Sequence, residues 1–337
     1  MADFKFLQNP VSNKWVISAP RRSHRTNVGK VAPVCPFCPG QEIAGEELYR
    51  VPGIKSIKGT TGITGNEKNK ASDTQWRIRV VANKFPFAPN HEIIIHSPDH
   101  HKNWDELPNS AVELILKTYR ERFNFHSRAG PHFVKTSRGK QVYIFHNSGS
   151  ASGASLDHPH TQLVVIPAQV KLDITPLNMD IYKRPFGLFG PAFAKASAGK
   201  PSQKNILETE HFLVSCPQAS EWPDEVWLSP KRQGAGFGSI SDLEITDLSF
   251  GLSRIIQIFD SRHGHEFPYN FYIHPGKNWY LRLIPRIKVV GGFELGTNII
   301  VNTQDPHETF AFIKEHFWEP DHAKIKSEHS AEYRKRV

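Results

Sequence analysis

Apolar residues recur along two stretches of the chain with the spacing i, i+3, i+4 and i+7, which is the period of an amphipathic helix. The first stretch carries Val112, Ile115, Leu116, Tyr119 and Phe123. The second begins at the pair Ser241-Asp242, which is typical of a helix N-terminus, and carries Leu248, Leu252, Ile255, Ile256 and Phe259. We therefore predict two long helices, each burying one apolar face in a core.

Short runs of apolar and aromatic residues flank each predicted helix, and these runs predict strands. They are residues 91–95, 142–145 and 162–167 in the first half, and 224–228, 271–274 and 280–285 in the second. The order strand, helix, strand, strand therefore occurs twice, which is how an internal duplication appears in a sequence. The pattern predicts an α+β protein of two related halves, with a mostly antiparallel sheet and flanking helices.

Chain length and loop composition also divide the protein into two parts. At about 150 residues per domain, a chain of 337 residues suggests two domain-sized units. Residues 51–75 are rich in Gly, Lys, Thr and Ser and predict a long loop, while the Gly- and Pro-containing stretch 185–205 predicts a linker or insertion. We expect an N-terminal half over 1–184 and a C-terminal half over 206–337.

The charge balance favours anionic partners. Lys and Arg number 42 against 33 Asp and Glu, a net charge of +9, which suits nucleotides or sugar phosphates. No basic stripe is interleaved with aromatic residues, so we do not expect a nucleic-acid partner. The sequence shows no signal peptide, no apolar run long enough to span a membrane and too few cysteines for a disulfide framework. We expect a soluble, cytoplasmic protein without membrane contact.

The segment His-Pro-His-Thr-Gln at 158–162 is the most specific chemical feature. Side chains alternate along an extended segment, so His158, His160 and Gln162 would share one face. The Gly- and Ser-rich stretch before it, 148–153, would let backbone N–H groups approach phosphate oxygens. Neutral imidazole is a competent nucleophile, and much of it is unprotonated near pH 7. On spacing alone, the two histidines are equally compatible with a metal pair or with surface polar residues.

Cys35 and Cys38 form a Cys-x-x-Cys motif, whose spacing lets both thiolates reach one metal ion. A redox pair is the alternative, but no thioredoxin-like βαβ pattern surrounds the motif. Tetrahedral zinc would need two further ligands, and the 18 histidines supply candidates. Cys216 has no partner in the sequence, and we expect it to be a small buried hydrophobic residue.

Taken in order, these motifs resemble the galactose-1-phosphate uridylyltransferase family of the histidine-triad superfamily, from about residue 9 to about residue 317. The resemblance implies two tandem histidine-triad-like halves, of which the C-terminal one is a degenerate copy. It also implies a double displacement: a histidine attacks the α-phosphorus of a nucleoside diphosphate sugar, and the nucleotidyl-histidine then reacts with a sugar 1-phosphate. The family further implies a homodimer.

The resemblance implies roles for individual residues in this chain. His160 would be the nucleophile and Gln162 would hydrogen-bond the phosphoryl oxygens. One structural zinc ion per chain would be bound by Cys35, Cys38, His100 and His158. The counterparts of the family's phosphate contacts are Arg22, Arg25, Asn147 and Ser155. The counterpart of its nucleotide contact is Asn83, and those of its hexose contacts are Lys288, Phe293 and Glu294.

Two departures from the family pattern bear on the substrates. Segment 278–286 lacks the histidines that build a second metal site in some family members, so we expect no second metal. Thr161 stands where uridylyltransferases typically have Gly, and this position looks more like the ADP-glucose phosphorylases, whose base is adenine and whose acceptor is phosphate. The base, the acceptor and the hexose therefore stay open.

The sequence favours a UDP-glucose–hexose-1-phosphate uridylyltransferase of galactose metabolism. The alternatives of the same chemical class are an ADP-glucose phosphorylase and a dinucleotide phosphorylase or hydrolase, which share the nucleophile but differ in the acceptor. A non-catalytic, zinc-stabilised nucleotide-binding protein is the alternative of a different class. Product analysis with and without a sugar 1-phosphate distinguishes the enzymes, whereas nucleotide affinity without turnover would indicate the binding protein.

Overall fold

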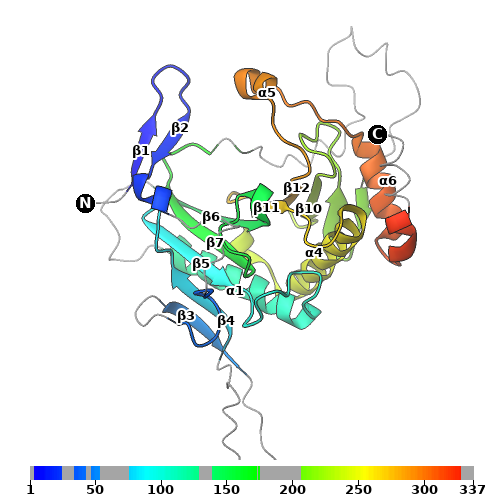
Figure 1. The fold of residues 1–337 in the computed structure, drawn as a ribbon, viewed down its shortest axis with the longest axis horizontal. Coiled ribbons are helices and arrows are strands. Elements are labelled where there is room, and N and C mark those ends of the chain that lie inside the picture. The colour runs from blue at the N-terminus through cyan, green and yellow to red at the C-terminus, as the bar shows by residue number, and fades with distance from the viewer. Residues whose placement is uncertain are drawn as a thin grey trace, which may run out of the picture. The chain divides into compact units, whose positions relative to one another are not determined.

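A computed structural model describes residues 4–24, 34–42, 47–53, 76–128, 139–172, 174 and 206–327 of the chain (Figure 1). The chain divides into two units, Met1–Lys171 and Leu172–Val337. Most of the predicted loop at 51–75 and the predicted insertion at 185–205 lie outside the described residues. Among the helices that the structure describes, none is both long enough and apolar enough to cross a membrane.

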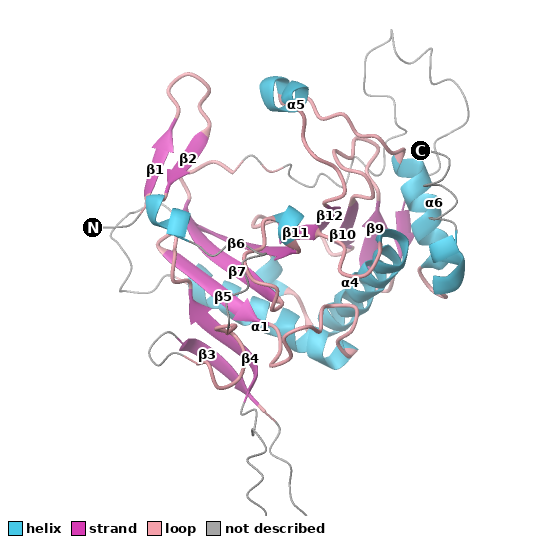
Figure 2. Ribbon diagram, viewed as in Figure 1, coloured by secondary structure: helices cyan, strands magenta, loops and turns pink. Residues whose placement is uncertain are grey.

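Antiparallel strands form the framework of the N-terminal unit (Figure 2). A small sheet pairs β1 (Lys5–Gln8) with β2 (Trp15–Ser18). The larger sheet has the order β3-β4-β5-β7-β6, with β3 (Glu47–Pro52), β4 (Trp76–Ala82), β5 (Asn90–Ile95), β6 (Lys140–Ser148) and β7 (His160–Pro167). Residues 91–95, 142–145 and 162–167 are therefore strands, as the sequence predicts.

Helix α1 (Asn109–Ser127) packs against β6 in this unit and buries the predicted apolar face, with Val112, Ile115, Leu116 and Tyr119 at 0% exposure. The same face also buries two polar side chains that apolar spacing does not reveal, Arg122 and His126. Both bind the carboxylate of Glu92 on β5, with Arg122 Nη2 and His126 Nε2 each 2.6 Å from Glu92 Oε1. The helix thus carries an ion pair as well as an apolar stripe.

The C-terminal unit is built in the same way. Its sheet has the order β11-β12-β10-β9-β8, with β8 (Ile206–Glu208), β9 (Phe212–Ser215), β10 (Val226–Pro230), β11 (Tyr269–Ile273) and β12 (Leu281–Pro285). Its helices are α4 (Asp242–His263), α5 (Gly292–Thr297) and α6 (Pro306–His316). Helix α4 begins as predicted, because the Ser241 side chain accepts from the Glu244 N–H and Glu244 accepts from the Ser241 N–H.

The two units share one strand order. In each unit the chain runs through two strands, a long helix and two more strands. In the sheet, these four strands have the order β4-β5-β7-β6 in one unit and β9-β10-β12-β11 in the other. A Ser-Pro pair begins two residues after Ile95 and again two residues after Trp227. Ile95 in the first unit therefore corresponds to Trp227 in the second. Ile95 pairs with His160, and Trp227 pairs with Arg282. The α+β class with mostly antiparallel sheet is confirmed, and Arg282 occupies the sheet position that corresponds to His160.

Asp224 connects several elements of the C-terminal unit and predicts a pH dependence of stability. Its side chain is buried, with Oδ2 2.9 Å from His263 Nε2 and 3.2 Å from Arg262 Nε, and with Oδ1 accepting from Thr309 and Gln304. Burial alone would raise the pKa of this carboxyl, but the bond to His263 and the charge of Arg262 outweigh it and lower the pKa.

Asp224→Asn is therefore expected to reduce the free energy of unfolding at neutral pH by about 3 kcal/mol, because it leaves a largely buried cation without its counterion. A carboxyl group whose pKa is lower in the folded than in the unfolded state stabilises the folded protein at pH values above its unfolded pKa. This stabilisation is lost as the pH falls through the folded pKa. The difference from the unsubstituted protein should shrink below about pH 4. Urea unfolding at several pH values measures this difference in the free energy of unfolding, and Glu210→Gln, at an exposed position, is the control. A difference that does not change with pH would contradict this account.

Candidate active site and metal centre

Two loops and the residue before β7 bring four possible metal ligands together in the N-terminal unit. One ligand atom from each of Cys35, Cys38, His100 and His158 lies within 4.8 Å of the other three. The Cys38 N–H donates to the Cys35 carbonyl, which closes a tight turn and turns both sulfurs to one side. His100 follows a turn in which the Asp99 N–H donates to the Ser97 hydroxyl. The sequence-predicted ligand set is thus assembled in space.

The spacing of these atoms fits zinc. Nδ1 of His158 lies 3.8 Å from Cys35 Sγ and 3.7 Å from Cys38 Sγ, and Nδ1 of His100 lies 3.3 Å from Cys38 Sγ. A tetrahedron with Zn–S of about 2.3 Å and Zn–N of about 2.0–2.1 Å requires ligand separations of about 3.3–3.8 Å. Burial and the neighbouring Cys35 raise the pKa of Cys38 to about 11, so a cation is needed to hold both sulfurs as thiolates.

The tautomer of His158 also fits a metal ligand. Its Nε2 lies 2.9 Å from the carbonyl oxygen of Ser97 and donates to it, which leaves the lone pair on Nδ1, the atom that faces the sulfurs. His158 is fully buried. Burial lowers its pKa to about 4, so the imidazole is neutral and able to bind a metal ion at neutral pH.

His160 opens strand β7 and is oriented by the residue that belongs to the metal cluster. Its Nδ1 lies 2.9 Å from the carbonyl oxygen of His158 and donates to it, so the lone pair resides on Nε2. The ring of Phe37, which directly precedes Cys38, contacts it edge to face at a centroid distance of 5.3 Å. Phe37 is itself packed against Trp76, Val81 and Ile95. A single backbone carbonyl thus couples the metal cluster to the tautomer of His160.

Gln162 lies on the same face of the sheet as His160. In the register of β5 and β7, His160 is opposite Ile95 and Gln162 is opposite Ile93, and alternate residues of a strand point to one side. Both side chains are buried at 5% exposure. Gln162 Oε1 lies 2.9 Å from Nε2 of His91, a contact that the sequence does not indicate.

Thr161 points to the opposite face, where its hydroxyl forms the centre of a buried polar network. Oγ1 lies 2.9 Å from His96 Nε2 and 3.0 Å from His146 Nδ1, and it accepts from the hydroxyl of Tyr119. A hydroxyl has one hydrogen and two lone pairs, so these three partners saturate it. Burial lowers the pKa of His146 to about 3 and that of His96 well below its usual value, which keeps both rings neutral.

Replacing Thr161 with the isosteric Val is therefore expected to destabilise the protein by about 2–4 kcal/mol, because buried partners lose their hydrogen bonds while the shape of the core is kept. Thr161→Ser retains the hydroxyl and is expected to cost much less. Denaturant midpoints at an unchanged m-value measure both variants. Equal stability of the two variants would show that methyl packing, and not the hydroxyl, explains the presence of Thr161.

The Gly- and Ser-rich turn lies between β6 and β7, beside the start of the strand that carries His160. It forms a short 3₁₀ turn over Ser150–Ser152, with Gly149 before it at φ +76° and Gly153 after it at φ +83°. These left-handed conformations require glycine. Asn147 is the second-to-last residue of β6, before this turn, and Ser155 follows the turn. Both side chains are half-buried.

Other predicted substrate residues are placed as follows. Arg22 Nη1 donates to the Phe85 carbonyl at 2.7 Å, and the guanidinium lies over the ring of Phe87. One N–H group of Arg22 is therefore bonded to the backbone of this chain. The Asn83 amide oxygen accepts from the Phe85 N–H at 2.8 Å, which turns its NH₂ group towards His91. Arg25 lies outside the described residues.

Lys288, Phe293 and Glu294 belong to the C-terminal unit, where they surround the start of α5. Lys288 Nζ lies 2.5 Å from Glu294 Oε1, and Glu294 Oε2 also accepts from the Gly291 N–H. The ring of Phe293 is 57% exposed. The carboxylate is therefore bound within its own segment, and a hexose would have to share it with these groups.

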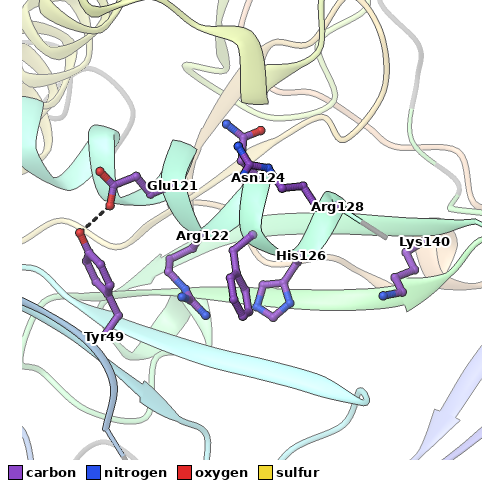
Figure 3. Close-up of a pocket in the computed structure, with 8 residues that line it drawn as sticks. Tyr49, Glu121, Arg122, Asn124, His126, Arg128 and Lys140 are labelled. Carbon is purple, nitrogen blue, oxygen red and sulfur yellow. Dashed lines mark hydrogen bonds between the residues drawn. The ribbon is translucent and has the colours of Figure 1, made fainter. Parts of the chain in front are cut away.

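A cavity of about 700 Å³ lies along α1 (Figure 3). Figure 3 shows Arg122 and His126 extending from α1, with Arg122 beside Tyr49, whose hydroxyl donates to Glu121. Glu92, which binds the same Arg122 and His126, follows His91 along β5 and so points to the face opposite Gln162. The cavity therefore does not include the predicted nucleophile.

Comparison with known proteins supports the family resemblance. Residues 66–166, which include both His158 and His160, match the family described as galactose-1-phosphate uridyl transferase, N-terminal domain. Two curated relatives extend over most of the chain. An ADP-glucose phosphorylase of Arabidopsis thaliana is 26% identical over 91% of this chain and 92% of that protein. A galactose-1-phosphate uridylyltransferase of Thermotoga maritima is 24% identical over 91% of this chain and 96% of that protein.

Solved structures share the fold. An Arabidopsis thaliana ADP-glucose phosphorylase with bound ADP-glucose superimposes with a TM-score of 0.61 at 24% identity, covering 93% of this chain and 99% of that chain. A uridylyltransferase structure gives a TM-score of 0.62 at 19% identity, covering 92% and 97%. The two kinds of relative are thus equally close in fold.

Proposed function

This chain is related to the galactose-1-phosphate uridylyltransferase family, and from that premise we propose that it transfers a nucleotidyl group from a nucleoside diphosphate sugar through a covalent intermediate on His160. The observation that carries the proposal is the hydrogen bond from His160 Nδ1 to the His158 carbonyl. It fixes the tautomer in which Nε2 holds the lone pair that attacks phosphorus.

The reaction proceeds in two displacements. In the first, His160 Nε2 bonds to the α-phosphorus of the donor while the bond from that phosphorus to the bridging oxygen breaks, releasing the sugar 1-phosphate. In the second, a phosphate oxygen of the acceptor attacks the same phosphorus and the N–P bond breaks, regenerating His160. The donors that we assign to the phosphoryl oxygens are Gln162, the N-terminal arginines and backbone N–H groups of the 148–155 turn. The N–H groups of residues 152–154 are not among them, because they donate to carbonyls within the turn.

Cys35, Cys38, His100 and His158 would hold a zinc ion, which would supply structural rigidity when bound. The Ser97 carbonyl accepts from His158 and orients its ring. A fixed His158 in turn fixes the carbonyl to which His160 donates, so this backbone carbonyl would connect the metal site to the proposed nucleophile.

For the substrates, we propose UDP-glucose as donor and a hexose 1-phosphate as acceptor, with Lys288, Phe293 and Glu294 contacting the hexose. The second candidate is ADP-glucose phosphorolysis, in which inorganic phosphate is the acceptor. The hydroxyl of Thr161 and the 26% identity to the Arabidopsis ADP-glucose phosphorylase favour this second candidate. We also propose a homodimer, as the resemblance to the family implies, and analytical ultracentrifugation would test it.

Intact-mass spectrometry after separate incubations with UDP-glucose and ADP-glucose tests the proposal. A uridylyl adduct that is discharged by galactose 1-phosphate would support the uridylyltransferase. An adenylyl adduct that is discharged by inorganic phosphate would support the phosphorylase. No adduct with either donor, in protein that contains zinc, would contradict nucleotidyl transfer through a covalent histidine.

A further inference from the structure

We propose that His91 is a positioning residue that fixes the orientation of the Gln162 side-chain amide, so that the NH₂ group of Gln162 and not its oxygen faces the reacting phosphoryl group. This inference rests on the proposed function, because it concerns the same site. His91 lies on β5 next to β7, and its side chain is buried at 5% exposure.

Three neighbours determine the state of the His91 ring. The backbone N–H of Phe87 faces Nδ1 at 3.4 Å, and Gln162 Oε1 faces Nε2 at 2.9 Å. A backbone N–H can only donate, so Nδ1 carries the lone pair and Nε2 carries the hydrogen. The hydrogen on Nε2 then points at Gln162 Oε1. The edge of the Phe87 ring, whose centroid lies 4.4 Å from that of His91, helps to hold the imidazole in place.

The orientation of the Gln162 amide follows from this tautomer. A primary amide has an acceptor end and a donor end, and electron density alone rarely separates them. Because the oxygen is bound by the His91 N–H, the NH₂ end is directed away from His91. Phosphoryl oxygens are acceptors only, so this is the end that can stabilise the charge that develops on them in the transition state. An amide turned the other way would repel them.

The third neighbour extends the argument to Asn83. Its amide oxygen accepts from the Phe85 N–H, and its Nδ2 lies 3.0 Å from His91 Nε2. With hydrogen on Nε2, two donors face each other at that distance. In this tautomer, an acceptor on a bound ligand would give the Asn83 NH₂ group a better partner than His91 Nε2 does. His91 thus prepares two amides, Gln162 and Asn83, to donate to an anionic or carbonyl-bearing substrate.

A double-mutant cycle on the rate of adduct formation tests this inference. His91→Leu is expected to reduce the maximal rate on the order of 10- to 100-fold, with a smaller change in KM, because the Gln162 amide loses its anchor. His91→Gln places an amide NH₂ group near the former Nε2 and should recover much of the rate. In a Gln162→Ala background, His91→Leu should have little further effect, since it acts through Gln162.

Several outcomes would overturn the inference. Additive losses in the cycle, or no recovery with His91→Gln, would show that His91 supports the fold alone; His265→Leu, an exposed histidine, controls for nonspecific effects. Nitrogen-15 NMR of the imidazole gives an independent readout, because hydrogen on Nδ1 would contradict the assigned tautomer whatever the activity. If the unsubstituted protein forms no adduct, the proposed function fails, whereas an adduct with additive losses refutes only the role of His91.

Discussion

His160→Ala is expected to abolish the nucleotidyl adduct and to lower the rate of nucleotidyl transfer by roughly four orders of magnitude. In the proposed reaction the imidazole forms the covalent bond, and direct attack of the acceptor on the donor would lack both this nucleophile and the two-step path that it provides. The change should be confined to chemistry. His160 contributes one hydrogen bond to the His158 carbonyl and an edge contact with Phe37, so the fold should survive its loss.

Adduct formation by intact mass and transfer by product analysis measure this expectation together. Binding of the donor, measured by calorimetry, should change little, which separates loss of the nucleophile from loss of the site. His265→Ala, at an exposed position of the other unit, serves as the matched histidine control. Near-normal transfer by His160→Ala would refute a covalent intermediate on this residue.

Cys38→Ser is expected to remove zinc and to lower the free energy of unfolding by at least about 3 kcal/mol, or roughly 10 °C in the midpoint temperature. The Cys38 sulfur lies close to Nδ1 of both His100 and His158, so its loss opens the ligand set at its centre. Adduct formation should fall along with zinc content. The reason is that His158, once released, no longer fixes the carbonyl that determines the tautomer of His160.

Metal analysis of purified protein and thermal unfolding with and without a chelator measure this expectation. Cys216→Ala provides the matched cysteine control, because Cys216 is buried in the C-terminal unit and does not belong to the four-residue cluster, so the zinc content should be unchanged. Full zinc content in Cys38→Ser would refute the assignment of this residue as a ligand. A zinc-free variant that forms the adduct at the normal rate would refute the coupling through the His158 carbonyl.

The periodicity of apolar residues predicts the elements of this fold because burial of a face dominates their stability. Strands 91–95 and 162–167 pair with each other, and His160 and Gln162, two of the three residues expected to share a face, do so. The third, His158, precedes the strand. Helix α4 begins at the predicted cap because capping is a local interaction between residues three positions apart. The prediction succeeded where it depends on the spacing of residues within one element.

The contacts that determine the state of the site residues could not be predicted in the same way. The Thr161 hydroxyl binds side chains from three separate segments, His96, Tyr119 and His146, and no local pattern in the sequence marks such a convergence. The contact between His91 and Gln162 spans 71 positions and depends on the strand register. Individual hydrogen bonds of this kind follow from tertiary packing, which the period of apolar residues does not specify.

The register of the C-terminal unit has a consequence for the evolutionary history of the chain. Arg282 stands where the other unit has His160, and Nη2 of Arg282 lies 2.8 Å from Glu225 and 2.9 Å from Glu221. Arg282→His would leave the buried Glu225 carboxylate without this cation, at a cost of about 3–5 kcal/mol. A second histidine at the position that corresponds to His160 therefore requires a compensating change at Glu225. The ion pair thus stabilises the difference between the two units.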